Sequence, residues 1–367
     1  MTLQPLSYYA HAIRPSLPAR AFTTVPSRLA WLLLHVATAV AGIVALWCGW
    51  GGLWAAPLYA LAIGHAFAGC AFVGHETMHG AVVRSRAARQ WIGWLCFLPF
   101  TMSPRLWVAW HNKTHHGNTM SEVNDPDAYP TLAAYRKSKV TRVADFFSFG
   151  RSRPAGLATL ALGFTGQSSQ MLLRWAPSSD AMSTRERRLA ILETLLGIAV
   201  WAALAVAIGP LKFLFAFGLP LLIGNFIVIS YILTNHSLSP LTEVNDPLVN
   251  SLTVTVPRIV DRLHLNFGLH VEHHLFPSMS SAYAPLVRAE LQARWPERYQ
   301  SMPLVRALAR LAVTPRVYAS PTRLYDPLTG AEAATLLPGA PIGSELPRAS
   351  LAPADEVAPE AAKLVTT

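Results

Sequence analysis

Residues 29–75 read LAWLLLHVATAVAGIVALWCGWGGLWAAPLYALAIGHAFAGCAFVGH and contain no Asp, Glu, Lys or Arg. The sequence Gly49-Trp50-Gly51-Gly52 divides this stretch into two apolar runs, at 29–49 and 53–75. A helix of about 20 apolar residues crosses the hydrocarbon core of a bilayer, so each run is long enough to span a membrane. Because the break is short and rich in glycine, we expect the two runs to form an antiparallel hairpin.

A second apolar pair, at 189–208 and 211–235, is divided by Gly209-Pro210. The sequence therefore predicts an all-α integral membrane fold with four transmembrane helices in two hairpins. Two further stretches, 91–110 and 155–173, are apolar but interrupted by proline or polar residues. We expect these two to be interfacial or re-entrant rather than to cross the membrane.

The composition agrees with a membrane protein. Of 367 residues, 52% are hydrophobic and only 14% are charged, whereas about a quarter of the residues in soluble domains are charged. The net charge of +10 is not concentrated in a nucleic-acid-binding segment, and we expect no nucleic acid partner. Basic residues flank the first hairpin while the hairpin tips carry only Lys212, which predicts cytoplasmic termini and a cytoplasmic central segment. We therefore expect a multi-pass protein of the bacterial inner membrane.

Three parts of the chain are expected. Residues 1–28 form a cytoplasmic N-terminal segment, 29–300 form the membrane domain, and 301–367 form a C-terminal segment. From about residue 321 the chain is rich in Pro and Ala, which predicts a mobile tail. The pentapeptide Glu-Val-Asn-Asp-Pro occurs at 122–126 and again at 243–247, and we interpret the repetition as chance or as shared turn geometry.

Histidines are the most informative residues of the chain. His75 and His79 share one helical face at the end of the second apolar run. The predicted topology brings this pair to the same side of the membrane as two later groups and one single histidine. We predict a metal centre formed by nine residues: His75, His79, His111, His115, His116, His236, His270, His273 and His274. Neutral imidazole is a ligand for Fe, Zn and Cu, and nine imidazoles are more than one ion can accept, so two ions are expected.

Zinc chemistry is an alternative for one part of this set. His75-Glu76-Thr77-Met78-His79 is HExxH, the motif in which two histidines hold zinc and the glutamate is the general base of a metalloprotease. An intramembrane protease of this kind is expected to have a later Asp-Gly motif, which this chain lacks. It would also leave seven of the nine histidines unused. A non-enzymatic metal carrier is a further alternative, although such a carrier should have more ionisable residues within the spans.

At these residues the chain resembles the membrane fatty acid desaturase and hydroxylase superfamily, from about residue 55 to 290. The resemblance rests on HxxxH at 75–79, HxxxHH at 111–116 and HxxHH at 270–274, within GHETMHGA, HHGNT, NDPD and LNFGLHVEHHLFP. It implies a cytoplasm-facing helical cap with two iron ions, held by the nine histidines. It also implies that O2 and two electrons remove hydrogen from an unactivated methylene of a lipid or acyl substrate. His236 matches the additional histidine of the family, and no catalytic residue beyond the ligands is predicted.

The resemblance also separates subtypes. The first box is HxxxH rather than the HxxxxH of acyl-CoA desaturases, and the third begins with His270 where front-end desaturases have Gln. Acyl-CoA desaturases have an Asn one turn before the fourth-span histidine, where this chain has Ile232, and Asn235 or Asn266 are candidates to replace it. No HPGG stretch of a fused cytochrome occurs, so the electrons are expected from a separate ferredoxin or cytochrome-type donor.

The expected function is O2-dependent desaturation of an acyl chain carried on a lipid or another acyl carrier. A hydroxylase or ketolase of the same superfamily, acting on acyl chains or carotenoids, is the nearest alternative. Acidic residues near the boxes are expected to orient the metal-bound imidazoles. The candidates are Glu76, Asp125, Asp127, Asp261 and Glu272.

Overall fold

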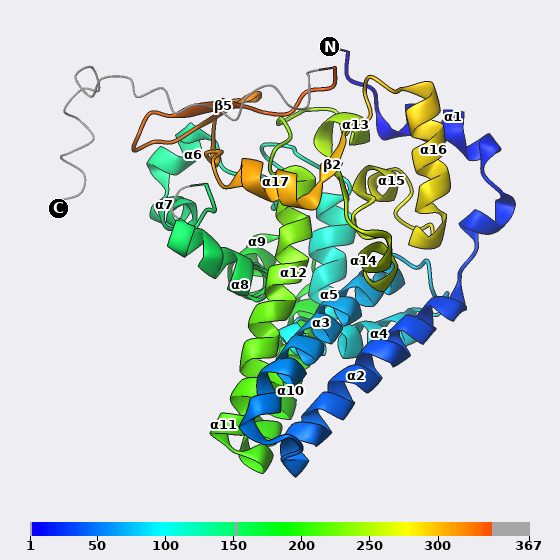
Figure 1. Cartoon of the computed structure of the whole chain (residues 1–367). Coiled ribbons are helices and arrows are strands. Elements are labelled where there is room, and N and C mark those ends of the chain that lie inside the picture. The colour runs from blue at the N-terminus through cyan, green and yellow to red at the C-terminus, as the bar shows by residue number, and fades with distance from the viewer. Residues whose placement is uncertain (1, 151–152, 340–367) are drawn as a thin grey trace.

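The computed structural model describes residues 2–150 and 153–339, and this part of the chain is mostly helical (Figure 1). Four of its helical segments are long and apolar enough to cross a membrane: Pro26–Cys48, Gly52–Met78, Thr184–Ile208 and Pro210–His236. They coincide with the four apolar runs, so the prediction of four candidate spans is confirmed. Their elements are η3 (Pro26–Arg28), α2 (Leu29–Cys48), α3 (Gly52–Met78), α10 (Thr184–Ile208), α11 (Pro210–Phe213), η7 (Leu214–Gly218) and α12 (Leu219–His236).

Local signals explain where these helices begin and end. Helix α2 ends at Gly49, whose φ of 72° is in the left-handed region that glycine adopts without strain. Helix α10 begins with a capping box, in which Ser183 and Glu186 each bond the backbone of the other. It ends at Gly209, and Pro210 then begins the next helix, where its missing N–H is not needed.

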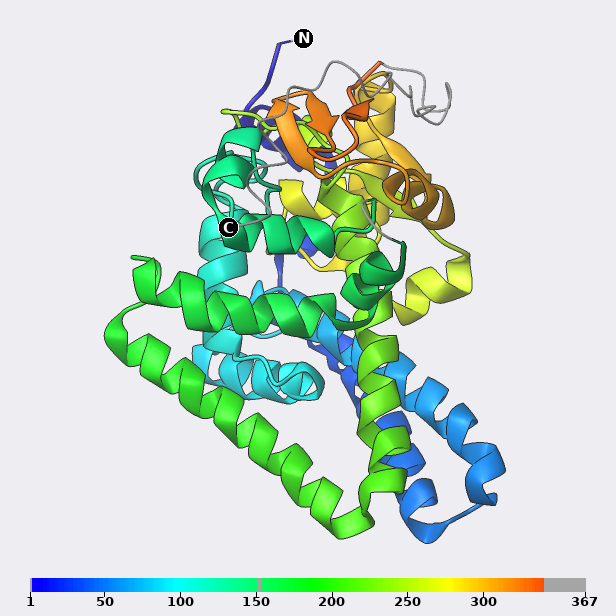
Figure 2. The ribbon, with the colours of Figure 1, turned by 90° about the vertical axis from the view of Figure 1, so that its left-hand side faces the viewer.

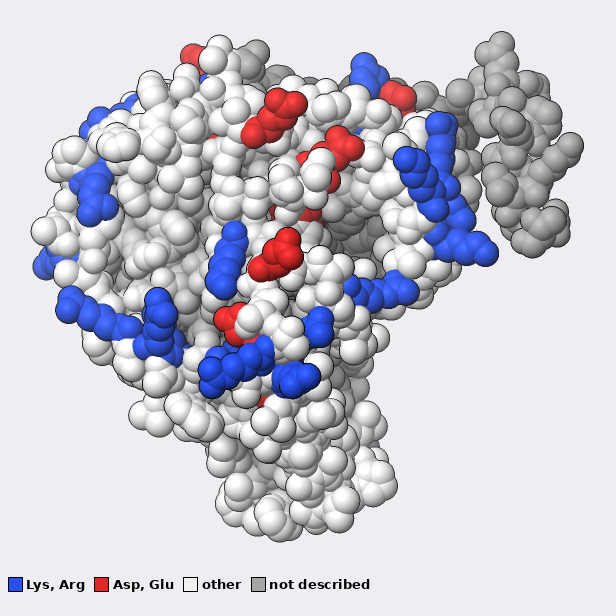
Figure 3. Space-filling view, turned by 180° about the vertical axis from the view of Figure 1, so that it is seen from behind, with Lys and Arg blue, Asp and Glu red and all other residues white. Residues whose placement is uncertain are grey.

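The four long helices extend from a broad upper part of the molecule into a narrower lower part (Figures 1 and 2). On the face drawn in Figure 3, the lower part carries no Lys, Arg, Asp or Glu, whereas charged side chains are spread over the upper part and along its lower border. Large apolar side chains of the lower part are exposed, among them Leu33, Trp54 and Val206. An exposed apolar surface of this extent is typical of contact with lipid.

Shorter helices surround the upper ends of the long ones. Helix α3 packs against α2, α4 and α12, and its second half is almost entirely buried. The interrupted stretch 91–110 is divided among α4, η4, α5 and the start of η5, and α8 covers most of 155–173. None of these elements is among the candidate spans found in the described residues. The shorter elements are α1 (Leu6–Ile13), η1 (Arg14–Ser16), η2 (Ala19–Phe22), α4 (Arg86–Phe97), η4 (Leu98–Phe100), α5 (Pro104–Trp107), η5 (Val108–His115), α6 (Leu132–Lys137), α7 (Lys139–Phe146), α8 (Arg153–Gln170), η6 (Met171–Trp175), α9 (Ala176–Ser178), α13 (Pro247–Asn250), α14 (Arg258–Leu263), α15 (His270–Leu275), η8 (Ser281–Tyr283), α16 (Ala284–Arg294) and α17 (Leu304–Leu311).

Two small sheets were not expected from an all-α prediction. Strands β1 (Thr253–Thr255) and β2 (Ser301–Pro303) pair in parallel. Strands β3 (Val317–Ser320), β4 (Arg323–Tyr325) and β5 (Glu332–Ala334) form an antiparallel sheet in chain order.

Strands β4 and β5 of the second sheet lie within the segment from residue 321 for which the sequence predicts a mobile tail. The amide of Leu336 donates to the carbonyl of Leu238, and the amide of Leu241 donates to the carbonyl of Pro321. These bonds attach the segment through Leu336 to the loop after α12. The remainder of the expected tail, residues 340–367, lies outside the described residues.

Candidate metal centre

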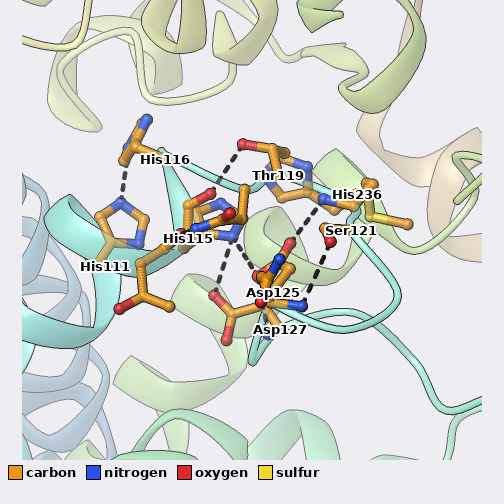
Figure 4. A network of polar contacts seen from close by, with 12 residues as sticks. His111, His115, His116, Thr119, Ser121, Asp125, Asp127 and His236 are labelled. Carbon is orange, nitrogen blue, oxygen red and sulfur yellow. Dashed lines mark hydrogen bonds and ion pairs between the residues drawn. The ribbon is translucent and has the colours of Figure 1, made fainter. Parts of the chain in front are cut away.

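All nine predicted histidines come together where α3, η5, α12 and α15 meet. His75 is in α3 and His79 follows it, His111 and His115 are in η5, and His116 follows that turn. His236 ends α12, and the last three histidines are in α15. Figure 4 shows part of the cluster, with His111, His115 and His116 on one segment and His236 beside them. The side chains form two groups rather than one.

The first group contains five imidazoles. His75, His79, His111, His116 and His273 each present a ring nitrogen, and these nitrogens all lie within 4.8 Å of one another. The Nε2 atom of His111 lies 3.2 Å from that of His75 and 3.1 Å from that of His116. The Nε2 atom of His273 lies 3.1 Å from that of His116.

The second group contains the other four imidazoles. The ring nitrogens of His115, His236 and His274 lie within 4.8 Å of one another. The Nε2 atom of His270 lies 2.7 Å from that of His236 and 3.1 Å from that of His274. His115 stacks on His111 with 5.1 Å between ring centroids, so the two groups are adjacent.

The second box divides between the groups because its backbone is a π-helical turn. The amide of His116 bonds the carbonyl of His111, five residues earlier, so these two side chains share a face and His115 lies on another. In α15 the i, i+4 pair His270 and His274 shares a face, while His273 belongs to the first group. Single π-helical turns inside helices are frequent at functional sites.

The nitrogen spacing fits two bound cations. Imidazole nitrogens bind a first-row metal such as zinc at about 2.0–2.1 Å, so two of them at a right angle lie about 3 Å apart. The separations of 3.1–3.2 Å in the first group match this value. The Nε2 atom of His79 is buried and has no hydrogen-bond partner, as expected of an atom that has a metal as its partner. The donor set therefore fits two borderline transition-metal ions.

Hydrogen bonds at Nδ1 leave Nε2 of several rings facing the cluster. His236 donates from Nδ1 to the carbonyl of Asn250, at 2.9 Å. The Nδ1 atom of His274 lies 3.3 Å from the hydroxyl of Thr119, which itself donates to the carbonyl of His115. Such partners fix the tautomer and the orientation of a metal-bound imidazole. Thr119 and Asn250 were not predicted from the sequence, because neither residue type is characteristic of this role.

His115 has the strongest partner of this kind. Its Nδ1 donates to Oδ1 of Asp125 at 3.0 Å, and Asp127 lies 3.4 Å away. Burial alone would lower the pKa of His115, but the charge and hydrogen bond of Asp125 raise it to about 9. A carboxylate that stabilises a proton on this ring also stabilises a metal ion bound to it. Asp125 and Asp127 are therefore the predicted acids that the structure places beside a ligand.

The surrounding imidazoles have the opposite electrostatic environment. Burial, together with the positive charge that neighbouring rings would carry, lowers the pKa of His111, His116, His270 and His274 well below the ordinary range. These rings are neutral at physiological pH, which is the form that binds a metal ion. The cluster as a whole thus resists protonation and favours cations that need unprotonated nitrogen.

The other predicted acids do not contact the imidazoles. Glu76 accepts hydrogen bonds from the Arg28 guanidinium at 3.0 Å and from the hydroxyls of Ser280 and Ser281. This carboxylate is fully engaged away from the metal groups, so it is not placed as the general base of a zinc protease. Asp261 has a buried oxygen without a partner.

Glu272 faces away from the cluster as well. Its carboxylate is fully buried and accepts from the hydroxyls of Thr253 and Tyr299. It therefore anchors α15 to the neighbouring sheet and orients no ring. Neither candidate for the missing asparagine reaches a ligand through a hydrogen bond, since Asn266 donates to the carbonyl of Ser281 and the amide of Asn235 is buried without a partner.

A cavity of about 880 Å³ lies next to the two imidazole groups. Imidazoles of both groups line it, and its other walls are mainly apolar side chains of α3, α8 and α12 together with aromatic rings. Exposed lining residues such as Val143, Leu162 and Leu173 show that it reaches the protein surface. The histidines on its wall are His75, His111, His115, His236 and His270.

This combination defines a helical protein with candidate membrane spans and a histidine-rich candidate metal centre next to a large, mainly apolar cavity. A family model described as fatty acid desaturase matches residues 52–305, and the chain belongs to that family, whose members are oxidoreductases. A probable fatty acid desaturase of Sorghum bicolor is 27% identical over 284 residues, which cover 73% of this chain and 71% of the relative.

Two chloroplastic plant relatives match over a smaller share of their length. The sn-2 acyl-lipid omega-3 desaturase (ferredoxin) of Arabidopsis thaliana is 26% identical over 61% of this chain and 52% of the relative. An omega-6 fatty acid desaturase of Brassica napus is 22% identical over 65% of this chain and 56% of the relative. The matched region thus spans little more than half of these two proteins.

Proposed function

We propose that this protein is an O2-dependent desaturase that inserts a double bond into a fatty acyl chain, using two iron ions held by the nine histidines. The observation that carries the proposal is the junction of the two imidazole groups with one apolar cavity. Iron bound there would supply the oxidising power for removing hydrogen from an unactivated methylene, with O2 and two electrons as co-reactants.

The cavity walls position the substrate. Phe97, Phe164 and Ile229 belong to the apolar lining and exclude water from a methylene chain. Because imidazoles of both groups line the cavity, one segment of the acyl chain can lie beside both metal positions. Two neighbouring methylene hydrogens must leave in succession for a double bond, and a fixed chain position favours that outcome.

The polar end of the substrate needs separate contacts. Gln170 and Arg174 line the same cavity, and Arg174 is exposed. These side chains can hold the polar end of an acyl carrier at the edge of the apolar cavity. The Arabidopsis relative is an acyl-lipid desaturase, which supports a lipid as that carrier. It is a desaturase of the ferredoxin type, which supports a separate ferredoxin-type donor for the electrons.

The membrane arrangement follows from charge. Exposed basic residues of the upper part include Arg14, Arg136 and Lys137, whereas Lys212 is at the lower end, between α10 and α12. By the positive-inside rule, the upper part with the metal centre faces the cytoplasm of a bacterial inner membrane. The four helices then form two hairpins within a membrane domain of residues 29–300, preceded by the segment 1–28 and followed by 301–367.

Expression in a bacterial host together with a ferredoxin and its reductase tests the proposal. Mass spectrometry of total lipids should show acyl chains two mass units lighter, and the purified protein should contain close to two iron atoms per chain. His274→Ala should abolish the product. His11→Ala is the matched control, because His11 is exposed and its ring bonds only the carbonyl of Ser7 one turn earlier.

Other products lead to other conclusions. A gain of one oxygen without loss of hydrogen would assign the hydroxylase alternative. Activity in protein that contains one zinc and no iron would reject the di-iron proposal.

A further inference from the structure

A row of three hydrogen-bonded side chains, Tyr231, His264 and His65, lies beside the candidate metal centre and is not part of it. The hydroxyl of Tyr231 in α12 lies 2.9 Å from Nδ1 of His264. The Nε2 atom of His264 in turn lies 3.2 Å from Nε2 of His65 in α3. Tyr231 and His264 are buried, at 1% and 6% exposure. In the described part of the chain, these residues belong to none of the groups with three or more potential metal ligands.

The row is arranged to move a proton away from the phenol. Burial and the neighbouring His65 and His35 lower the pKa of His264 to about 3, so its ring is neutral. A neutral ring that accepts the phenolic hydrogen at Nδ1 carries its own hydrogen on Nε2 and donates it to His65. One shift along these two hydrogen bonds would transfer a proton from Tyr231 to His264 and from His264 to His65.

Aromatic contacts connect the same tyrosine with the metal centre. The ring centroids of Tyr231 and Phe267 are 5.7 Å apart, and those of Phe267 and His75 are 5.0 Å apart. A parallel contact runs from Tyr231 to Phe72, at 5.7 Å, and Phe72 packs on Phe267 at 4.5 Å. Tyr231 is therefore separated from a predicted metal ligand by one phenylalanine ring.

Phe72 and Phe267 line the substrate cavity, whereas Tyr231 and His264 do not. An electron that passes from Tyr231 to the metal centre thus bypasses the acyl chain. Removing an electron from a phenol is favourable only when its proton can leave. The hydrogen bond from Tyr231 to His264 gives that proton an acceptor, so the phenol is the most readily oxidised group of the three.

We propose that Tyr231, His264 and His65 form a proton-coupled redox relay that reduces the metal centre when it has reacted with O2 and no acyl chain is present. The proposal rests on the proposed function, which supplies O2 as the oxidant. Tyr231 gives one electron to the oxidised centre, its O–H bond breaks, and the proton forms an N–H bond at Nδ1 of His264. The Nε2 proton of His264 moves to His65, and a neutral tyrosyl radical remains. An electron from the external donor and return of the proton restore the phenol.

Electron paramagnetic resonance of the iron-loaded, full-length protein tests the relay. Reduced protein is mixed with O2 without substrate and frozen. A tyrosyl radical is expected, with a spectrum that narrows when the protein carries ring-deuterated tyrosine. Tyr231→Phe should lose the signal. Tyr318→Phe is the matched control, because Tyr318 is also buried but donates to a backbone carbonyl, that of Ser239, rather than to a base.

A second readout follows the damage that the relay prevents. After repeated cycles with O2 and donor but no substrate, peptides containing Phe72 or Phe267 should gain oxygen in Tyr231→Phe and remain unmodified in the wild type and in Tyr318→Phe. Mass spectrometry of digested protein measures this gain without reference to activity.

The outcomes separate the relay from the proposed function. A radical that survives in Tyr231→Phe, or that has a tryptophan spectrum, would overturn the relay. If the wild type still yields desaturated product, the desaturase proposal stays intact. Trp107 is the indole to expect in that case, since its ring centroid lies 4.5 Å from that of His111. Absence of both product and radical would reject both proposals.

Discussion

Replacing Asp125 with Asn should weaken metal binding because no orientation of the amide reproduces the carboxylate. Oδ1 of Asp125 accepts from Nδ1 of His115 at 3.0 Å and from the amide of Asp127 at 3.0 Å, and Oδ2 accepts from the amide of Met120 at 2.7 Å. If the Asn oxygen takes the first position, its NH2 group faces the Met120 amide. If the amide is reversed, His115 must accept at Nδ1 and carry its proton on Nε2, where it can no longer bind a metal.

The substitution should lower both the affinity for the metal and the free energy of unfolding. Loss of a partner that orients a metal-bound imidazole lowers metal affinity about 10- to 100-fold, which corresponds to about 1.4–2.8 kcal/mol. A buried donor left without an acceptor costs a further ~1–3 kcal/mol of folding free energy. Asp125 has a fully buried side chain, so water cannot replace the lost acceptor.

Asp246→Asn provides the matched control, since Asp246 is the same residue of the second Glu-Val-Asn-Asp-Pro copy. Both carboxylates accept the amide two residues later, from Asp127 at 3.0 Å and from Leu248 at 3.1 Å. Asp246 is also fully buried, but its other oxygen accepts from Arg298 rather than from a histidine. The control should lose stability and keep its iron.

The assay measures iron per folded chain at several concentrations of a competing chelator, with the melting temperature of the same samples. Asp125→Asn should release iron at a chelator concentration about 10- to 100-fold lower than Asp246→Asn does. Equal release from the two variants would refute the reasoning, because the loss would then come from the turn and not from the imidazole.

Three further predictions concern ligation, packing and pH. His115→Ala should abolish turnover and lower the iron content, while His11→Ala should retain both, as measured by lipid analysis and metal analysis. Gly69→Ala should destabilise the protein by about 1–3 kcal/mol, because the new Cβ would lie 2.2 Å from an imidazole of α2. Gly166→Ala is the control, since its Cβ would meet no atom within 4 Å, and it should be neutral or stabilising. Thermal melting measures both effects. Metal-free protein should lose stability as the pH falls below 6.5. Burial and the charges of neighbouring rings lower the pKa of His273 from 6.5 to about 3, so the unfolded state binds more protons than the folded state in this range. An unchanged melting temperature between pH 7.5 and pH 5 would contradict this.

The candidate spans and the grouping of the histidines were accessible from the sequence because both depend on local patterns. An apolar run of about 20 residues is the requirement for crossing a bilayer, and the four runs became the four candidate spans. Histidines at i and i+4 on a regular helix share a face, and His75 with His79 follows this rule. The family resemblance added His236, which has no histidine close to it in sequence.

The division into two groups was not accessible in the same way. The spacing of His111 and His115 suggests a shared face, but the π-helical turn pairs His111 with His116 instead. Which carboxylate reaches a ring depends on turns that form only when distant segments pack, so Asp125 and Glu76 looked equivalent. The strands β3–β5 were missed because each is only three or four residues long, and the loop after α12 that holds them is remote in sequence.

The contacts of Glu76 also determine when during synthesis the metal centre can close. Its carboxylate lies in the first histidine box, and its hydroxyl partner Ser280 is 204 residues further along the chain. The last ligand, His274, is made only a few residues before that serine. A chain is synthesised from its N-terminus, so a nascent protein carries an incomplete ligand set and a partly paired acid until its final quarter emerges. If the nine histidines hold iron as proposed, only chains extended past His274 carry the complete ligand set, and a product truncated before that residue would lack at least one ligand.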